Sequence, residues 1–384
     1  MKIGIPKEVK AGETRVALVP ALVSTLTKLN HEVIVEKGCG QAAFFPDESY
    51  REAGATIVDN AQELYRQADV VFKVQPPMMH PLTKMHEAEM LKDGATLIGF
   101  LAPLQQPELI KILQKKKITA FSMEFVPRIS RAQSMDALSA MANIAGYKSV
   151  LMAANLLGKM FPLLMTAAGT IPPVNALILG VGVAGLQAIA TAKRLGARVE
   201  AFDPRPAVQE QVQSLGAKFI EMELPEEDVE TEGGYAKEQS DAFLQKEREA
   251  IAGRLHQTDV VITTAQIFGK KAPVLITEEM VQLMSQGSVI IDLAAEQGGN
   301  CALTEAGKTV ERHGVSIVGA VNIPATVPVH ASQLYSKTVT NLFKHVFKED
   351  QPDFEDEITK KACITRQGEI VNEWVASVMQ EGGK

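Results

Sequence analysis

Three glycines and one aspartate stand out by their types and their spacing. Gly180, Gly182 and Gly185 form a Gly-x-Gly-x-x-Gly after an apolar run, and a helical pattern begins at Val183. Asp203 ends a second apolar run about 20 residues further on. Such glycines permit a tight turn, a close approach of backbone to a pyrophosphate, and close packing of helix on strand. The helix start favours phosphate charge. The pattern predicts a dinucleotide site; the alternative is a glycine turn without a ligand.

The aspartate also predicts which dinucleotide binds. The carboxylate of Asp203 would accept hydrogen bonds from free ribose hydroxyls and repel a 2′-phosphate, which favours NAD(H) over NADP(H). Arg205 is the counter-argument, because a nearby arginine can accommodate that phosphate. We give the acid more weight, because it lies at the strand end itself.

Polar side chains follow three later strands of the same predicted domain. They lie in the segments 263–269, 292–300 and 321–324. Open parallel sheets bind ligands outside the carboxyl ends of their strands. Gln266 and Asn322 are therefore predicted to contact the cofactor as well.

A separate segment, 127–136, is dense in donors and acceptors and precedes a long helical pattern. Arg128, Gln133 and Asp136 make it a candidate site, because clefts form at domain junctions. A purely structural reading is a helix N-terminus that Ser134 caps, with Asp136 near the positive end of the helix dipole.

An acidic segment, 221–239, interrupts the regular alternation and contains Gly233 and Gly234 before Tyr235. Its composition predicts a surface loop. The glycine pair would supply a hinge for a lid over a ligand, and the alternative is a passive insertion.

These residues need elements that position them, and the chain predicts an α/β fold. Two Rossmann-like, doubly wound, mostly parallel sheet domains are joined by long helices. The expected parts are an N-terminal domain, a linking helix, a nucleotide domain and a return helix, at residues 1–136 plus 346–384, 137–165, 166–326 and 327–345 respectively. Strands of the nucleotide domain are expected at 176–180, 199–203, 217–221, 259–263, 288–292 and 315–318.

Composition narrows the class of protein. The chain has 384 residues and a net charge of −7 without a basic block, which argues against nucleic acid as a partner. Its three cysteines are far apart and fit a reducing compartment. No charged residue lies between Lys159 and Lys193, but prolines and glycines would break a spanning helix, so we expect buried core there. No metal site is expected.

Several blocks together resemble one family. These are Met1–Glu8 with Arg15–Ala17, Pro127–Asp136, Gly180–Gly196, Gly233–Glu238 and Gly298–Cys301. They resemble the NAD(H)-binding domain I of proton-translocating nicotinamide nucleotide transhydrogenase, which is related to alanine dehydrogenase. The resemblance runs almost end to end, and the second block is the most specific.

The resemblance implies a function, partners and a location. Family members pass a hydride directly between NAD(H) on domain I and NADP(H) on domain III, and a membrane domain couples this to proton movement. Domain I usually forms a dimer. Because the sequence ends at Lys384, it resembles the versions in which domain I is a separate soluble subunit. That implies a cytoplasmic protein, peripheral on the inner membrane through a membrane subunit that carries the proton channel.

The resemblance also assigns roles to residues. Arg128, Gln133 and Asp136 match the loop that positions the nicotinamide end, and Asp203 matches the ribose acceptor. Arg128 and Asp136 are then expected to hold the loop and Gln133 by a charge-assisted hydrogen bond. Tyr235 matches the tip of a mobile loop that closes on the nucleotide. Pro204 departs from the close pattern and should stiffen its turn.

Two other functions stay open. In an alanine-dehydrogenase-like enzyme, Arg15, Lys73 and Glu296 would hold a carboxylate substrate and its amine. That chemistry needs a general acid/base, and the segment 100–103 lacks the histidine that related dehydrogenases carry there. The other is a non-catalytic NAD-binding regulatory subunit, because hydride transfer between nicotinamides needs no acid, base or metal from the protein.

Overall fold

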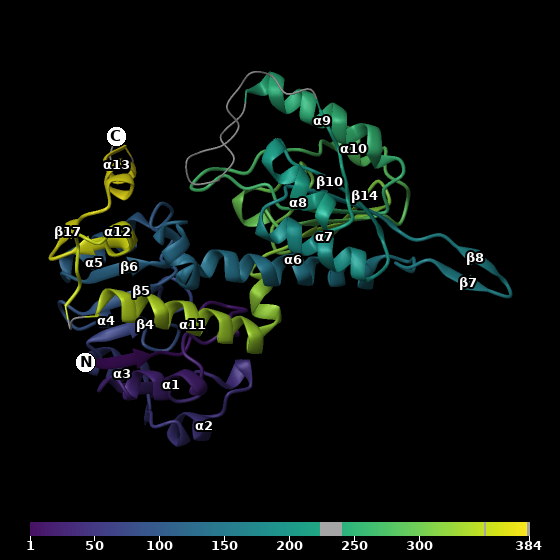
Figure 1. Cartoon of the computed structure of the whole chain (residues 1–384). Helices are drawn as coiled ribbons and strands as arrows, with labels where there is room; N and C mark the ends of the chain where they lie inside the picture. The colour runs from purple at the N-terminus through teal and green to yellow at the C-terminus, as the bar shows by residue number, and fades with distance from the viewer. Residues whose placement is uncertain (223–239, 349–350, 382–384) are drawn as a thin grey trace. The chain divides into compact units, whose positions relative to one another are not determined.

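The computed structural model describes residues 1–222, 240–348 and 351–381 (Figure 1). The chain forms two compact units, which are described separately. The first comprises Met1–Met141 with Pro324–Lys384, and the second comprises Ala142–Ile323. The first unit thus includes the helix that the sequence predicts as a return segment.

The first unit is built on an eight-stranded sheet in the order β17-β16-β6-β5-β4-β1-β2-β3. Its strands are β1 Lys2–Ile5, β2 Glu32–Glu36, β3 Thr56–Val58, β4 Val70–Phe72, β5 Thr96–Gly99, β6 Thr119–Ser122, β16 Cys363–Arg366 and β17 Glu369–Ile370. The strands from β1 to β6 pair in parallel, whereas β16 and β17 pair antiparallel at one edge. The short strand β3 and the two edge strands were not predicted.

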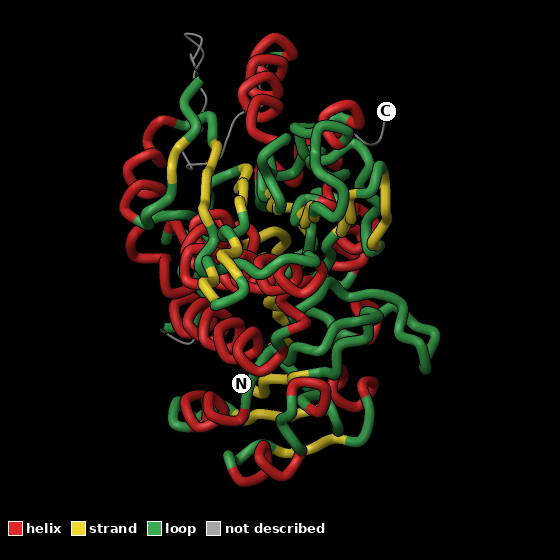
Figure 2. The backbone as a smooth tube through the Cα atoms, turned by 90° about the vertical axis from the view of Figure 1, so that its right-hand side faces the viewer, coloured by secondary structure: helices red, strands yellow, loops and turns green. Residues whose placement is uncertain are grey.

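Helices cover this sheet, and Figure 2 shows helices beside the strands. They are α1 Pro20–Thr27, α2 Asp47–Glu52, α3 Ala61–Gln67, α4 Glu87–Met90, α5 Pro107–Lys115, α11 Pro328–Val346, α12 Glu357–Ala362 and α13 Glu373–Glu381, with short 3₁₀ turns η1 Gln41–Ala43, η2 Met123–Phe125 and η3 Ser130–Met135. Helix α11 buries Tyr335, Val339, Leu342 and Phe343, spaced for one helical face. The Tyr335 hydroxyl also donates to the Lys73 carbonyl at 2.6 Å.

The second unit is built on a seven-stranded sheet in the order β11-β10-β9-β12-β13-β15-β14. Its strands are β9 Asn175–Leu179, β10 Arg198–Phe202, β11 Lys218–Phe219, β12 Val260–Thr263, β13 Val289–Asp292, β14 Thr309–Arg312 and β15 Val315–Gly319. Apart from β14, which pairs antiparallel at the edge, this is the doubly wound order 3-2-1-4-5-6, and its direction reverses between β9 and β12. The predicted α/β class is confirmed.

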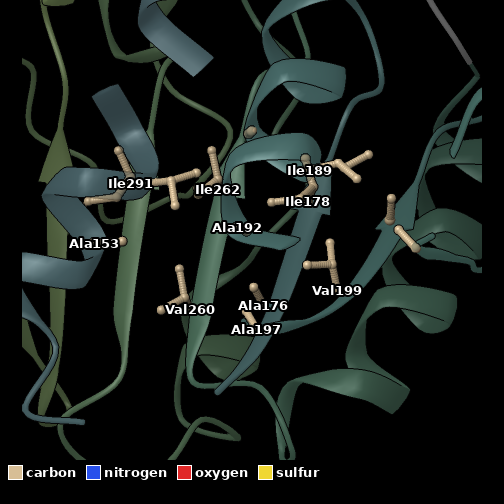
Figure 3. Close-up of a cluster of buried hydrophobic side chains, with 14 of the residues drawn as sticks. Ala153, Ala176, Ile178, Ile189, Ala192, Ala197, Val199, Val260, Ile262 and Ile291 are labelled. Carbon is tan, nitrogen blue, oxygen red and sulfur yellow. The ribbon is translucent and has the colours of Figure 1, made fainter. Parts of the chain in front are cut away.

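Branched side chains on the strands and small residues on the helices form the core of this unit (Figure 3). Ile178, Ile262 and Ile291 come from adjacent strands, and Ile189 and Ala153 come from helices. The elements besides the strands are α6 Ala137–Leu156, which spans the boundary between the units, and α7 Val183–Arg194, α8 Gln209–Ser214, α9 Asp241–Leu255, α10 Glu278–Val281, η4 Pro206–Val208, η5 Ala295–Gln297 and η6 Ile323–Thr326. The small residues let helices approach the sheet closely.

The linking helix predicted over 137–165 is too long. Helix α6 ends at Leu156, and a hairpin of β7 Leu164–Thr166 and β8 Gly169–Ile171 follows (Figure 1). Gly158 and Pro162 are poor helix formers and explain the early end. Among the described residues, no helix is both long and apolar enough to cross a membrane.

Candidate functional site

The glycine turn after β9 has two glycines that sterics require and one that leaves space. Gly180 has a φ of +88°, and a Cβ there would lie 2.7 Å from the Thr264 hydroxyl. A Cβ on Gly185 would lie 2.0 Å from the Gly180 carbonyl oxygen. At Gly182, by contrast, no other atom lies within 4 Å of where a Cβ would be. The open space thus lies just before Val183, the first residue of α7.

The turn lies at the border of β9 and β12, where the strand order reverses. Thr264 joins the two strand ends, because its N–H donates to the Leu179 carbonyl at 2.8 Å and its hydroxyl donates to the Gly180 carbonyl at 2.9 Å. In doubly wound sheets, the crevice outside the carboxyl ends at this reversal is where ligands bind. The sequence pointed to the segment but not to the role of this threonine.

Asp203 follows β10 directly and is 5% exposed. Its oxygens accept hydrogen bonds from the backbone N–H of Val181 at 2.7 Å and the backbone N–H of Arg205 at 3.0 Å. The Arg205 guanidinium adds a fork, with Nε at 2.8 Å and Nη2 at 2.9 Å. The predicted acid therefore lies at the glycine turn, and the predicted arginine is bound to it.

A second acid near this carboxylate escaped the sequence reasoning. Glu247 on α9 is only 3% exposed. Burial, followed by the charge of Asp203, raises its pKa to about 7. Its position was readable from the four-residue spacing of Phe243, Glu247, Ile251 and Leu255, all of which α9 buries. A carboxyl group on an otherwise apolar helix face is the signal that could have revealed it.

Asp292 organises the loop after β13 and is fully buried. Its carboxylate accepts five hydrogen bonds of 2.7 to 3.1 Å, from the Thr263 and Thr304 hydroxyls and the N–H groups of Ala294, Asn300 and Cys301. The Asn300 side chain in turn bonds both backbone polar groups of Ala265. These contacts fix the loops after β12 and β13 as one rigid edge.

Gln266 and Asn322 follow β12 and β15 at the carboxyl edge of the same sheet. The Gln266 side chain is exposed and donates to the Leu293 carbonyl at 2.9 Å. Asn322 has a φ of +46°, and its N–H donates to Glu296 at 3.3 Å. Both predicted residues thus share the sheet edge with the glycine turn.

The segment with Arg128, Gln133 and Asp136 belongs to the first unit. Arg128 and Gln133 are exposed, and Asp136 is partly buried. Asp136, rather than Ser134 as predicted, caps α6, because its carboxylate accepts the N–H of Ser139 at 2.8 Å. Among the described residues its side chain bonds only Ser139, so the predicted bond to the Gln133 side chain is not formed.

Distant parts of the first unit hold this segment in place. The Asn341 side chain of α11 donates to the Ser134 carbonyl at 2.9 Å. Arg131 pairs with Asp356, which also accepts from His345 at 2.7 Å. Burial opposes ionisation of Asp356, but the hydrogen bonds from His345 and Arg131 hold its pKa well below the usual range. No local pattern in the sequence links this segment to the C-terminal region of the chain.

The residues of the dehydrogenase alternative already have partners. Arg15 is 4% exposed, and its guanidinium donates to Glu13 at 2.8 and 2.7 Å. Lys73 is fully buried and pairs with Glu8 at 3.2 Å and Glu87 at 2.8 Å. These cations are thus neutralised by carboxylates of the chain itself. Glu296 belongs to the other unit.

Two further expectations concern the loop with Gly234 and Tyr235 and the absence of a metal. Gly234 and Tyr235 lie outside the described residues. Within 1–222, 240–348 and 351–381, no group of three or more His, Cys, Asp or Glu side chains is arranged to hold a metal ion. The space beside Gly182 and the acid at Asp203 suit a dinucleotide, because a Cβ would fill the first and a ribose needs the second.

Comparisons with known proteins agree over nearly the whole chain. The alanine dehydrogenase/PNT N-terminal domain matches residues 4–145, and the alanine dehydrogenase/PNT C-terminal domain matches residues 149–373. A chain of the NAD(P) transhydrogenase alpha subunit of Rhodospirillum rubrum is 52% identical over 377 residues, 97% of this chain and 98% of that protein. The transhydrogenase structure from Sinorhizobium meliloti matches with a TM-score of 0.84 and 39% identity over 97% of this chain and 100% of that one. An L-alanine dehydrogenase structure matches with a TM-score of 0.83 and 27% identity over 99% of each chain.

Proposed function

This chain belongs to the alanine dehydrogenase/PNT family, and we propose that it is the NAD(H)-binding subunit of a proton-translocating transhydrogenase. In this proposal a hydride passes directly between NAD(H) on this chain and NADP(H) on a partner domain. A membrane subunit carries that domain and the proton channel, and this chain docks on it from the cytoplasm at the inner membrane. The similarity to a transhydrogenase subunit along 97% of the chain supports this choice.

The observation that carries the proposal is the open space at Gly182 beside the start of α7. A pyrophosphate placed there meets the N–H groups of the first helical turn, which have no partner within the helix, and the positive end of its dipole. Asp203 then faces the adenosine ribose. These two features hold one end of a dinucleotide and leave its other end to be positioned elsewhere.

NAD(H), when bound, supplies or accepts the hydride, so the task of the chain is orientation. We assign the nicotinamide end to Gln133, which is exposed on η3. A neutral amide both donates and accepts, and it adds no charge beside the developing positive ring. Asp136 fixes the segment by capping α6, and Arg128 completes the polar surface.

We also propose a homodimer. The β7–β8 hairpin projects from the second unit, and the side chains of Leu163, Met165 and Ile171 around it are 52%, 73% and 45% exposed (Figure 1). A lone two-stranded hairpin with an apolar surface is marginally stable unless something packs on it. Light scattering should give twice the chain mass, and the double variant Met165→Ser/Ile171→Ser should shift it towards the monomer.

The alanine dehydrogenase alternative keeps one supporting observation, the structural match at 27% identity. The carboxylate partners of Arg15 and Lys73 weigh against it, because a keto acid would have to displace them. A purely regulatory subunit would bind NAD(H) without supporting transfer.

One experiment separates the three functions. The chain is mixed with NADH and a transhydrogenase domain III loaded with NADP⁺, and NADPH formation is followed. Transfer that needs both proteins supports the proposal. NADH oxidation by pyruvate with ammonium supports the dehydrogenase, and binding without either reaction supports a regulatory subunit.

A further inference from the structure

The carboxylate of Asp203 has its hydrogen-bonding positions filled by the chain itself. A carboxylate offers about four lone-pair positions. The donors observed are the N–H of Val181, the N–H of Arg205, and Nε and Nη2 of the Arg205 guanidinium, at 2.7 to 3.0 Å. Two hydroxyls of a ribose that approached Asp203 would therefore find their positions occupied.

Of these donors, only the guanidinium can leave. The N–H of Val181 belongs to the glycine turn, and the N–H of Arg205 is fixed by the backbone. Pro204 stiffens that backbone, because its ring fixes its own φ and restricts the residue before it. The Arg205 side chain is 13% exposed, so it can turn towards solvent, whereas Asp203 cannot move away.

The surrounding charge explains why the guanidinium is there. Asp203 and Glu247 bring two carboxyl groups into one buried region, where the charge of Asp203 disfavours ionisation of Glu247. A fork of charge-assisted hydrogen bonds from Arg205 balances the negative charge. The same fork shields a 2′-phosphate from Asp203, which weakens the repulsion on which discrimination against NADP(H) depends.

We propose that Arg205 competes with the nucleotide ribose for Asp203 and thereby limits how strongly this chain selects NAD(H) over NADP(H). The inference rests on the proposed function, because it requires the adenosine ribose to bind at Asp203. In the free chain Arg205 occupies the carboxylate. On binding, the two ribose hydroxyls take the positions of Nε and Nη2, and Arg205 turns outward.

The test is isothermal titration of the full-length chain with NADH and with NADPH. Arg205→Met keeps an unbranched apolar stem and removes every side-chain donor. We expect NADH to bind about tenfold more tightly, the change that one charge-assisted hydrogen bond carries. NADPH should bind more weakly, so the ratio of the two dissociation constants should rise by more than tenfold.

Two controls make the result specific. Arg254→Met removes a positive charge from the same unit, where Arg254 pairs with Glu200, and should change neither constant. In an Asp203→Asn background the effect of Arg205→Met should vanish, because the competition has lost its target. If Arg205→Met does not fold, Arg205→Lys keeps the charge without the fork and should shift both constants in the same directions by a smaller factor.

The outcomes distinguish this inference from the proposed function. Unchanged or weaker binding of NADH by the Arg205 variants would overturn the competition, as would an effect that persists in the Asp203→Asn background. A wild-type chain that does not bind NADH at all would instead refute the proposed function.

Discussion

The polar sites of the two units are built in opposite ways. In the second unit, Asp203 and Asp292 are buried and bonded to the loops around them, so the nucleotide edge is rigid before any ligand arrives. In the first unit, Gln133 is exposed, and its segment is held through backbone contacts and through Arg131. The difference suggests a division of labour, in which one unit supplies affinity and the other supplies orientation.

The largest effect should come from filling the space in the glycine turn. Gly182→Val puts a side chain where no atom lies within 4 Å, so the variant should fold normally. NADH affinity should fall by about 10³-fold, because two or more charge-assisted bonds to phosphate are lost. Titration measures this, and thermal unfolding checks the fold.

Two other glycines make the comparison sharper. Gly253→Val also enters open space but lies on α9, so NADH affinity should be retained. Gly185→Ala meets the Gly180 carbonyl and should instead destabilise the fold. Normal NADH binding by Gly182→Val would show that the pyrophosphate lies elsewhere.

The next effect should be on rate rather than affinity. Gln133→Asn shortens the reach of the amide by one methylene and should slow hydride transfer to the partner's NADP⁺ by roughly 10²-fold, the cost of about 1 Å of misplacement. NADH affinity should change little, because the glycine turn and Asp203 are untouched. Single-turnover stopped flow and titration measure the two quantities, with Gln105→Asn as an exposed control in the same unit.

This pair of measurements can also break the division of labour. If Gln133→Asn abolished NADH binding while transfer at saturating NADH stayed normal, the first unit would supply affinity and not orientation.

A smaller effect concerns stability and pH. The pKa of Glu247 rises from 4.5 to about 7 on folding, so between these values the folded chain holds a proton that the unfolded chain has lost. The free energy of unfolding should therefore fall as pH rises, by about 2 kcal/mol between about pH 5 and pH 7 from this group. Glu247→Gln cannot ionise and should lose that part of the slope in urea titrations.

The neighbouring acid provides the control. Glu249 is exposed on the same helix, and Glu249→Gln should keep the wild-type slope. A Glu247→Gln chain with the full wild-type pH dependence would mean that Glu247 is ionised in the folded state.

The smallest effect is expected where the first unit anchors its polar segment. Arg131 is half exposed and pairs with Asp356, and exposed pairs contribute little free energy. Arg131→Gln should slow hydride transfer only a few-fold and leave NADH affinity unchanged. Lys361→Gln, which breaks the exposed Lys361–Glu357 pair, should change neither in the same stopped-flow assay. A loss as large as that of Gln133→Asn would show that the anchor, and not the amide, sets the geometry.

The sequence predicted the fold class, most strands of both sheets and the family, and the comparisons confirm the family. Local signals carried these predictions, such as the glycine spacing at Gly180 and the apolar strands. Elements that depend on distant contacts were missed, including β3 and β16 and the early end of α6 at Leu156. Side-chain partners could not be predicted, because nothing local to Asp136 or Asp203 says that Ser139 or Arg205 will bond them.

The most direct test of the account follows the hydride itself. NADH deuterated at the transferable position is bound to this chain, and a domain III loaded with NADP⁺ is added in a single turnover. If the two nicotinamides meet directly, all the deuterium appears in NADPH, and Gln133→Asn slows this step without releasing label. Deuterium lost to solvent, or NADH oxidised without labelled NADPH, would contradict direct transfer.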